Sequence, residues 1–300
     1  RNSVRSGPIS NERAREPTMS PSPTCFDVQI ADHVAHIKLN RPDKLNAMNR
    51  AFWHELPEIV GDINDNARAR CIVISSTGKH FSAGMDLSVF TDGSSMISAA
   101  GMDHAIRGEA LRKHIRHLQD TFACLDEARM PVLAAIQGGC IGGAVDMMSA
   151  CDIRYCTQDA FFCIQEINIG ITADVGTFPR LCKLLPEGQV RELAYTGRRL
   201  PAARAQALGL VNEVYPDQAA MLSAVMATAR EIAAKNPVAV SGSKVMINYA
   251  RDHSIDDALD YIAVWQTGML AREHMKEAFE SQAQKRPARY PDLAPLKKGI

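Results

Sequence analysis

The sequence predicts an α/β fold in which short buried strands alternate with helices in a spiral, followed by a helical C-terminal region. The segments RCIVISS (70–76) and PVLAAIQG (131–138) are short, continuous apolar runs, the pattern of strands buried on both faces. Loops and amphipathic helical segments separate these runs. Because units of strand, loop, helix and strand recur with little similarity between them, the order favours a βα superhelix over an open Rossmann sheet.

The N-terminal elements follow from side-chain alternation and capping residues. Residues 26–40 alternate in the manner of a strand pair, with a turn at residues 31–32. A polar loop follows, and Asn49 can cap a helix that runs from about residue 50 to 64. The internal Pro57 argues against a fully regular helix at that point.

The middle of the chain is expected to hold a long helix, a glycine-rich turn and two further strands. The amphipathic pattern predicts the helix over about 102–127. The segment GCIGGAVDMMSAC (139–151) is typical of a glycine-rich turn that leads into an apolar helix. The next segment, DIRYCTQDAFFCIQE (152–166), predicts two short strands.

Three parts are expected along the chain. Residues 1–24 are rich in Arg, Ser and Pro and have no apolar core, so we expect a disordered tail, a tag or an organelle-targeting remnant rather than a secretory signal. Residues 25–216 carry the recurring units of the spiral core. From Asp217 the pattern is helical, with Pro237 starting a new segment, so residues 217–300 are expected to form a helical region with its own apolar faces.

Composition restricts the possible classes of function. Lys+Arg and Asp+Glu both number 34, and this neutral balance argues against a broad nucleic-acid-binding surface. No apolar run reaches the length of a membrane span. The 8 cysteines form no CxxC pair and the 9 histidines lack metal-ligand spacing, so we expect reduced thiols and no metal site.

Five motifs, in the same order, resemble those of the enoyl-CoA hydratase/isomerase (crotonase) superfamily. They are LNRPDKLNAMN (39–49), HFSAGMDL (80–87), QGGCIGGAVDMMSACDIRYCTQDAFF (137–162), QEINIGITADVGTFPRL (165–181) and TGRRLPAARAQALGLVNEV (196–214). Within the superfamily, the third and fourth motifs look most like the Δ(3,5)-Δ(2,4)-dienoyl-CoA isomerases. The resemblance implies a ββα spiral core, a C-terminal helical trimerisation region, an acyl-CoA substrate and a homo-oligomer, either a trimer or a dimer of trimers.

Two glycine-flanked loops are suited to stabilising a thioester enolate. Such an enolate is a developing oxyanion that needs two hydrogen-bond donors aimed at one point, and backbone N–H groups at helix starts can supply them. The family pattern places these donors at the N–H groups of Met85 and Gly143. Taken singly, each loop could equally be an ordinary structural turn.

Three carboxylates lie in apolar segments and are the candidate catalytic groups: Asp146 in AVDMM, Glu166 in CIQEINI and Asp174 in ITADVGT. A buried carboxylate is costly unless it is paired or functional. Each alone could be a satisfied structural acid, but all three stand at positions that match the family's active site.

Proton counting separates the possible reactions. A shift from 3,5 to 2,4 double bonds removes a proton from C2 and adds one at C6, too far apart for one short side chain. Two carboxyls are needed, one ionised and one protonated, and burial with like-charge repulsion can keep one of them neutral. We assign Glu166 to C2 and Asp174 to C6, with the reverse order left open, and Asp146 tunes the pair or orients a neighbour. The family's hydratases use two glutamates and have a glycine-like residue where this chain has Asp174.

Other residues are expected to bind the coenzyme A ester. The first two motifs supply Lys44, Asn46, Ala47, Ala83, Gly84, Asp86 and Leu87, and the C-terminal region supplies Phe279 and Lys285 by resemblance to family residues that reach coenzyme A, sometimes across a subunit boundary. Lys44 could equally be an ordinary solvated lysine. The predicted helix 102–127 lines the acyl tunnel or packs in the core with Ile106, Leu111, Ile115 and Leu118. No cofactor is expected beyond the coenzyme A of the substrate, because the thioester itself acidifies C2.

Two alternative functions stay open from the sequence. An enoyl-CoA hydratase would share the fold, although Asp146 and Asp174 argue against it. An RNA-binding relative lacks support, since the chain has no run of basic residues interleaved with aromatic ones. A mitochondrial location is expected from the Arg- and Ser-rich start, with peroxisome or cytoplasm as alternatives, and the C-terminal PLKKGI lacks an SKL-type peroxisomal signal.

Overall fold

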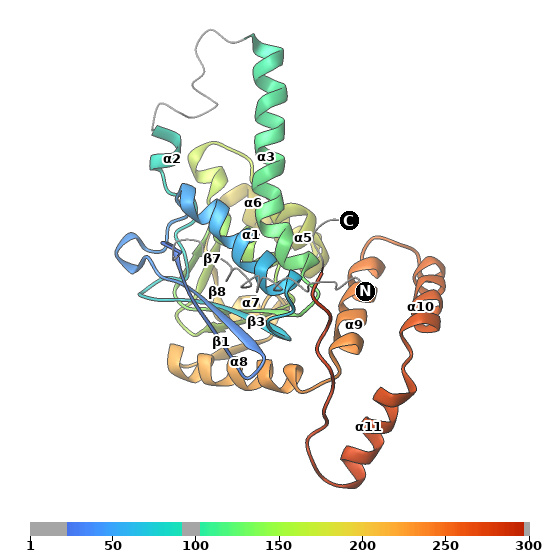
Figure 1. Cartoon of the computed structure of the whole chain (residues 1–300). Helices are drawn as coiled ribbons and strands as arrows, with labels where there is room; N and C mark the ends of the chain where they lie inside the picture. Colours follow the sequence, from blue (N-terminus) through green and yellow to red (C-terminus); the bar gives the residue numbers. More distant parts are fainter. Residues whose placement is uncertain (1–22, 92–102, 297–300) are drawn as a thin grey trace, which may run out of the picture.

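The computed structural model of the chain describes residues 23–91 and 103–296. Within these ranges a main sheet has six strands in the order β1-β2-β3-β4-β6-β9 (Figure 1). They are β1 (Phe26–Ala31), β2 (Val34–Leu39), β3 (Cys71–Ser76), β4 (Val132–Ile136), β6 (Ile153–Thr157) and β9 (Glu213–Tyr215). β1 pairs with β2 antiparallel, and every later strand is parallel to the one before it. Because the chain always advances in one direction across the sheet, it winds as the predicted spiral.

A second, smaller sheet accompanies the first. It has the order β5-β7-β8, formed by β5 (Gly139–Ile141), β7 (Phe161–Cys163) and β8 (Leu200–Pro201). β4 is followed at once by β5, and β6 by β7. Successive turns of the spiral therefore contribute one strand to each sheet, which places the loops at these strand ends side by side.

Helices connect and cover the strands. In the described part of the core they are α1 (Arg50–Asp65), α2 (Ser88–Thr91), α3 (His104–Glu127), α4 (Gly143–Ser149), α5 (Thr177–Leu184), α6 (Glu187–Thr196), α7 (Ala202–Ala207) and α8 (Gln218–Ala233), with short 3-10 turns η1 (Pro42–Lys44) and η3 (Glu166–Ile169). The side chain of Asn49 accepts a hydrogen bond from the Phe52 N–H, so the predicted cap of α1 is confirmed. Pro57 lies inside α1 without ending it.

The turn between the first two strands falls one residue later than predicted. Asp32 and His33 have φ angles of 51° and 60°, and the strands on either side pair in register. Two consecutive residues with positive φ match the twist of an antiparallel pair, which explains the two-residue connection at this place.

Helices from both halves of the chain cover the main sheet. On one side the aromatic rings of Phe52 and Trp53 in α1 pack with Phe122 of α3. On the other side α8 packs Met221 and Val225 against β2, β3 and β4. The helix that opens the predicted C-terminal region thus shares the core of the main sheet.

The long helix α3 has nearly its predicted bounds and is capped by Asp103. Of its predicted apolar face, Ile106 is 62% exposed, Leu118 is half-buried against the core, and full burial begins only at Thr121. Figure 1 shows the N-terminal part of α3 extending beyond the rest of the core.

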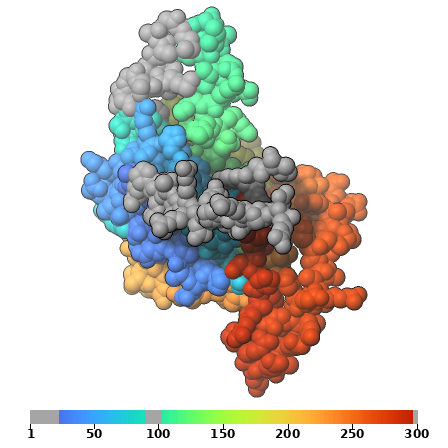
Figure 2. All heavy atoms as spheres, in the orientation of Figure 1, coloured from blue at the N-terminus to red at the C-terminus, as the bar shows by residue number. Residues whose placement is uncertain are grey.

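The last three helices form an arm beside the core. They are α9 (Pro237–Ala250), α10 (Ile255–Met269) and α11 (Arg272–Ala283), and both overall views show them as a separate lobe (Figures 1 and 2). Large apolar side chains are exposed on this arm: Ile247, Ile255, Leu259, Val264, Leu270 and Phe279. The polar segment after α11 returns to the core, where Asp292 pairs with Arg70 at 2.6 Å.

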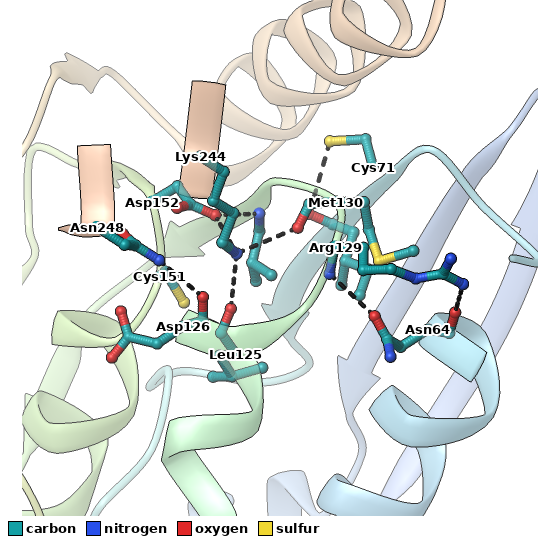
Figure 3. Close-up of polar contacts among 12 residues, drawn as sticks. Asn64, Cys71, Leu125, Asp126, Arg129, Met130, Cys151, Asp152, Lys244 and Asn248 are labelled. Atoms are coloured by element: carbon teal, nitrogen blue, oxygen red, sulfur yellow. Dashed lines mark hydrogen bonds and ion pairs between the residues drawn. The ribbon is translucent and has the colours of Figure 1, made fainter. Parts of the chain in front are cut away.

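A buried lysine ties the arm to the core (Figure 3). The Nζ of Lys244 in α9 donates to the carbonyl oxygens of Leu125 at 2.8 Å and Met130 at 3.2 Å, and it lies 2.9 Å from Oδ2 of Asp152. The same Asp152 oxygen accepts from the Val132 N–H at 2.7 Å. One ammonium group therefore joins α9 to the end of α3 and to the strands β4 and β6.

None of the helices in the described ranges combines the length and the apolar character that a membrane crossing requires. All 8 cysteines are free thiols; six are buried, Cys124 is half-buried, and Cys182 lies exposed on α5. The predicted tail, residues 1–24, lies almost wholly outside the described residues.

Candidate active site

Asp146 is the most deeply buried of the three candidate acids. It lies in α4 with a side chain that is 0% exposed. Its Oδ1 accepts hydrogen bonds from the N–H of Thr177 at 2.6 Å and from its hydroxyl at 2.7 Å. Its Oδ2 is buried and has no hydrogen-bond partner among the described residues. Asp146 therefore holds the start of α5 and still presents one unsatisfied oxygen.

Burial raises the pKa of Asp146 to about 7. The two bonds from Thr177 oppose this rise because they favour the ionised form, whereas the nearby charges of Glu166 and Asp174 reinforce it. The acid thus has a protonation state that changes near neutral pH.

Glu166 begins η3 and faces the glycine-rich turn. Its Oε1 lies 3.2 Å from the point that a Cβ on Gly142 would occupy, so a side chain at Gly142 would crowd the carboxylate. Its Oε2 is buried without a hydrogen-bond partner in the described part of the chain. Burial raises the pKa of Glu166, bonds from backbone N–H groups lower it, and the charge of Asp174 raises it further.

Asp174 is exposed in the single chain, which corrects the prediction that apolar neighbours bury it. Ala173 and Val175 on either side are buried, whereas the Asp174 side chain between them is exposed. Partial desolvation still raises the pKa of Asp174, and the electrostatic interaction with His114 on α3 lowers it.

The three acids lie within electrostatic reach of one another. The charge of Asp174 raises the pKa of both Asp146 and Glu166, and the charge of Glu166 raises the pKa of Asp146. The structure therefore brings together the three carboxylates predicted from separate segments. Their mutual repulsion favours a state in which at least one of them is protonated.

The two candidate donor loops run side by side on neighbouring turns of the spiral, where Ser82 and Cys140 form a parallel bridge. The Ser82 N–H donates to the Gly139 carbonyl at 3.2 Å, and the Ile141 N–H donates back to the Ser82 carbonyl at 3.1 Å. At Gly84, with φ at 81°, a Cβ would lie 2.5 Å from the Ile141 carbonyl oxygen. Only glycine allows this approach.

The predicted donors, the N–H groups of Met85 and Gly143, lie close together. The Met85 nitrogen is 4.0 Å from the point that a Cβ on Gly143 would occupy. In the hydrogen bonds that the described residues form, the neighbours of Met85 pair with Met48, but neither Met85 nor Gly143 donates its N–H. Two unpaired donors next to each other, with Glu166 beside Gly142, form the arrangement that an enolate oxygen requires.

The residues predicted to bind coenzyme A fall into different environments. Lys44 is exposed, and Ala47 and Ala83 are half-buried near it on the loop surface. Asn46 is only 2% exposed, and its amide donates to the carbonyl oxygens of Thr77 at 2.7 Å and His80 at 3.0 Å. The side chain of Asn46 therefore holds the two loops together and has no donor left for a ligand.

At the end of the loop 80–87, Asp86 also has partners within the protein. Asp86 lies 3.6 Å from the Arg41 guanidinium and accepts from Ser88, and these contacts lower the pKa of Asp86. Leu87 is exposed.

Phe279 and Lys285 do not approach the acids within one chain. Phe279 is 65% exposed on α11, and Lys285 follows the end of the same helix. Figure 1 places α11 at the outer end of the arm, apart from the spiral core.

Sequence reasoning missed three residues that support the site. Thr177 anchors Asp146, Ser82 donates to the Asn46 carbonyl at 2.8 Å, and Gln119 donates to the Asp174 carbonyl at 2.7 Å. No pattern in the sequence marks them, because each acts through a contact with a distant segment. Among the described residues there is no group of three or more His, Cys, Asp or Glu side chains that could hold a metal ion.

A family model described as enoyl-CoA hydratase/isomerase matches residues 29–293. The chain belongs to the enoyl-CoA hydratase/isomerase family. Among its relatives is the mitochondrial Delta(3,5)-Delta(2,4)-dienoyl-CoA isomerase of Rattus norvegicus, 45% identical over 86% of this chain and 78% of the relative. The peroxisomal enzyme of the same name from Arabidopsis thaliana is 38% identical over 87% of this chain and 93% of the relative. A short-chain-enoyl-CoA hydratase from Clostridium acetobutylicum is 31% identical over 84% of this chain and 92% of the relative.

Solved structures of the family share the fold. An enoyl-CoA hydratase from Bacillus anthracis superposes with a TM-score of 0.78 at 28% identity, over 91% of this chain and all (100%) of the other. A protein described as a hydratase of this kind from Streptomyces coelicolor reaches a TM-score of 0.80 at 23% identity, over 94% and 99% of the two chains. The predicted crotonase-like fold, a spiral core with C-terminal helices, is thereby confirmed.

Proposed function

We propose that this family member is a Δ(3,5)-Δ(2,4)-dienoyl-CoA isomerase that acts in fatty-acid β-oxidation. The observation that carries the proposal is the presence of Asp174 within electrostatic reach of Glu166 and Asp146, where Glu166 itself lies beside the glycine-rich turn with the unpaired Gly143 N–H. The identity of 45% with the Rattus norvegicus isomerase over most of both chains supports the same reaction.

The proposed reaction begins with binding of the thioester oxygen by the N–H groups of Met85 and Gly143. These donors stabilise the negative charge that develops there when Glu166 removes a proton from C2. The resulting trienolate is conjugated as far as C6. Asp174, which enters in its protonated form, delivers its proton to C6, and the electrons return from the oxygen to form the 2,4-diene. One proton is taken and one is given, so the substrate needs no other reactant.

In this scheme Asp146 influences the protonation states of Glu166 and Asp174. Its pKa of about 7 lets it carry a proton or a negative charge at neutral pH, and its charge acts on the same buried site as Glu166. Its bonds to Thr177 fix the start of α5, a few residues beyond Asp174. No cofactor is required besides the coenzyme A of the substrate.

The proposed assembly is a homo-oligomer, a trimer or a dimer of trimers, formed through residues 217–300. The exposed apolar side chains of the arm support this, because a contiguous set of such residues marks an interaction surface. In such an assembly Phe279 and Lys285 would reach the coenzyme A of a neighbouring subunit, and residues 25–216 would hold the acids. The names of the Rattus norvegicus and Arabidopsis thaliana relatives support a mitochondrial or peroxisomal location.

Enoyl-CoA hydration is the second candidate, favoured by the 31% identity to the Clostridium acetobutylicum hydratase. Absorbance separates the two reactions. Isomerisation of 3,5-dienoyl-CoA gives a conjugated 2,4-dienoyl-CoA that absorbs at longer wavelength, whereas hydration of a 2-enoyl-CoA removes absorbance. Efficient hydration of crotonyl-CoA together with no turnover of 3,5-dienoyl-CoA would overturn the isomerase proposal.

A further inference from the structure

The segment that carries Asp174 has no regular secondary structure between η3 and α5. It lies between Gly170 and Gly176, whose φ angles of 80° and 134° are readily adopted by glycine. A segment with such ends can swing unless other residues hold it. The direction of the Asp174 carboxyl therefore depends on contacts made by its own backbone.

Two side chains from different helices make these contacts. After Asp174, Asp146 of α4 accepts two bonds from Thr177. At Asp174 itself, Nε2 of Gln119 in α3 donates to the backbone carbonyl oxygen at 2.7 Å. This second bond acts on the peptide group that directly follows the Asp174 Cα, so it restricts the rotation that would swing the carboxyl.

The amide of Gln119 is itself oriented. Its Oε1 accepts from NH1 of Arg116 at 3.0 Å. A guanidinium can only donate and a carbonyl oxygen can only accept, so the two neighbours assign the amide oxygen to Arg116 and the amide nitrogen to Asp174. Arg116 lies one turn before Gln119 on the same helix, α3. The two side chains, Arg116 and Gln119, are together called the clamp.

We propose that Gln119 is a positioning residue that fixes the Asp174 carboxyl where it can protonate C6, an inference that rests on the proposed isomerase function. The clamp gives the poorly buried, projecting helix α3 a part in the reaction. It acts on the second proton transfer only, because Gln119 contacts the Asp174 segment and not Glu166 or the backbone donors.

Removal of the clamp should separate the two proton transfers. In Gln119→Met the side chain keeps its length but loses the donor, so Asp174 is no longer held. A misplacement of about 1 Å can cost about 100-fold in rate. We expect kcat for 3,5-dienoyl-CoA to fall about 10- to 100-fold, with KM within about twofold of wild type. Glu166 still removes the C2 proton, so exchange of the C2 hydrogen of the substrate into D2O should continue.

The experiment measures isomerisation by absorbance and C2 exchange by proton NMR in D2O, with the full-length protein. A rise of the exchange-to-isomerisation ratio in Gln119→Met supports the proposal, because a general loss of folding would lower both rates together. Gln119→Glu is a second variant of the same shape whose ionised side chain cannot donate, and the same rise is expected. Gln206→Met, at an exposed position of α7, is the matched control and should leave both rates unchanged.

Two results would overturn the inference. One is wild-type kcat in Gln119→Met, and the other is an equal fall of exchange and isomerisation in both Gln119 variants. Asp174→Asn distinguishes this failure from failure of the proposed function. If Asp174→Asn abolishes isomerisation while Gln119→Met does not reduce it, only the positioning role of Gln119 is wrong. If Asp174→Asn isomerises normally, the role of Asp174 and the inference that depends on it both fail.

Discussion

Replacement of Lys244 by Met should destabilise the protein by loosening the arm from the core. The ammonium group of Lys244 is buried with three oxygen partners, two of them backbone carbonyls and the third a carboxylate (Figure 3). Met has nearly the same length and fills the same space, but it donates no hydrogen bond. The substitution therefore leaves the carbonyls of Leu125 and Met130 without this donor and leaves Asp152 without its counter-charge.

The loss of stability in Lys244→Met depends on the contacts that Asp152 keeps. Removal of one partner of a buried ion pair typically costs about 3–5 kcal/mol. Asp152 keeps its bond from the Val132 N–H and its side chain is 26% exposed, so water can reach it and the lower value of about 3 kcal/mol applies. For 300 residues the entropy of unfolding is about 0.6 kcal/mol/K, which gives a fall in Tm of about 5 °C.

Thermal unfolding at a fixed protein concentration measures this fall, because subunit association would otherwise change Tm. Lys276→Met is the matched control: Lys276 is 74% exposed on α11 and its pair with Glu280 spans 3.7 Å, so its loss should shift Tm by less than about 1 °C. A shift in Lys244→Met no larger than that of the control would refute the reasoning. The added change Asp152→Asn removes the uncompensated charge and should restore part of the lost stability.

Three further predictions concern the site. Asp174→Asn and Glu166→Gln should each abolish isomerisation, measured by absorbance, while acyl-CoA binding by calorimetry stays within about threefold, since neither change alters the shape of the side chain. The free energy of unfolding in urea should decrease as pH rises between about 4 and 7, because the pKa of Asp146 is about 7 when folded and near 3.8 when unfolded, so the folded state binds more protons in that range. Asp146→Asn should remove this part of the pH dependence. Gly84→Ala should lower kcat by about 100-fold or more, because its Cβ would lie 2.5 Å from the Ile141 carbonyl and displace the Met85 donor.

Each of the three predictions for the site has an outcome that would contradict it. Near-normal turnover of Asp174→Asn would remove the reason to prefer isomerisation over hydration. An unfolding free energy with the same pH slope in wild type and Asp146→Asn would show that another group titrates in this range. Wild-type kcat in Gly84→Ala would mean that the close approach of Gly84 to the Ile141 carbonyl does not set the donor position. Gly61→Ala, on α1 with open space around it, is the control for the same chemical change.

The sequence was sufficient for features that depend on local chemistry. The continuous apolar run 71–76 is a strand buried along its whole length, and Asn49, Asp217 and Pro237 lie at helix starts, because propensity and capping act over a few residues. The sequence also indicated which loops carry the candidate acids and donors, and strand order in a spiral brings these successive strand ends together; their catalytic roles stay predictions.

Features that depend on tertiary packing were not predictable in the same way. Asp174 stands among apolar residues in the sequence, but the structure buries its neighbours Ala173 and Val175 and leaves Asp174 exposed. The sequence left the apolar face of α3 either lining an acyl tunnel or packing in the core, and the structure packs only its C-terminal part, from Leu118 onward, against the core. The Asn46 amide was expected near a ligand and is instead used between two loops, a contact that joins segments about thirty residues apart and has no local signature.

The parallel bridge between the loops 80–87 and 138–143 has a consequence for how such enzymes diversify. The loops continue from β3 and β4, which are hydrogen-bonded neighbours in the main sheet, so the separation of the two donors derives from the strand repeat of about 4.8 Å. That repeat is a property of the polypeptide backbone and does not vary with side chains or with the length of the insertions between the strands. In the proposed mechanism, carboxylates can therefore be exchanged, added or lost around the site over evolutionary time while the spacing of the two proposed enolate donors stays the same.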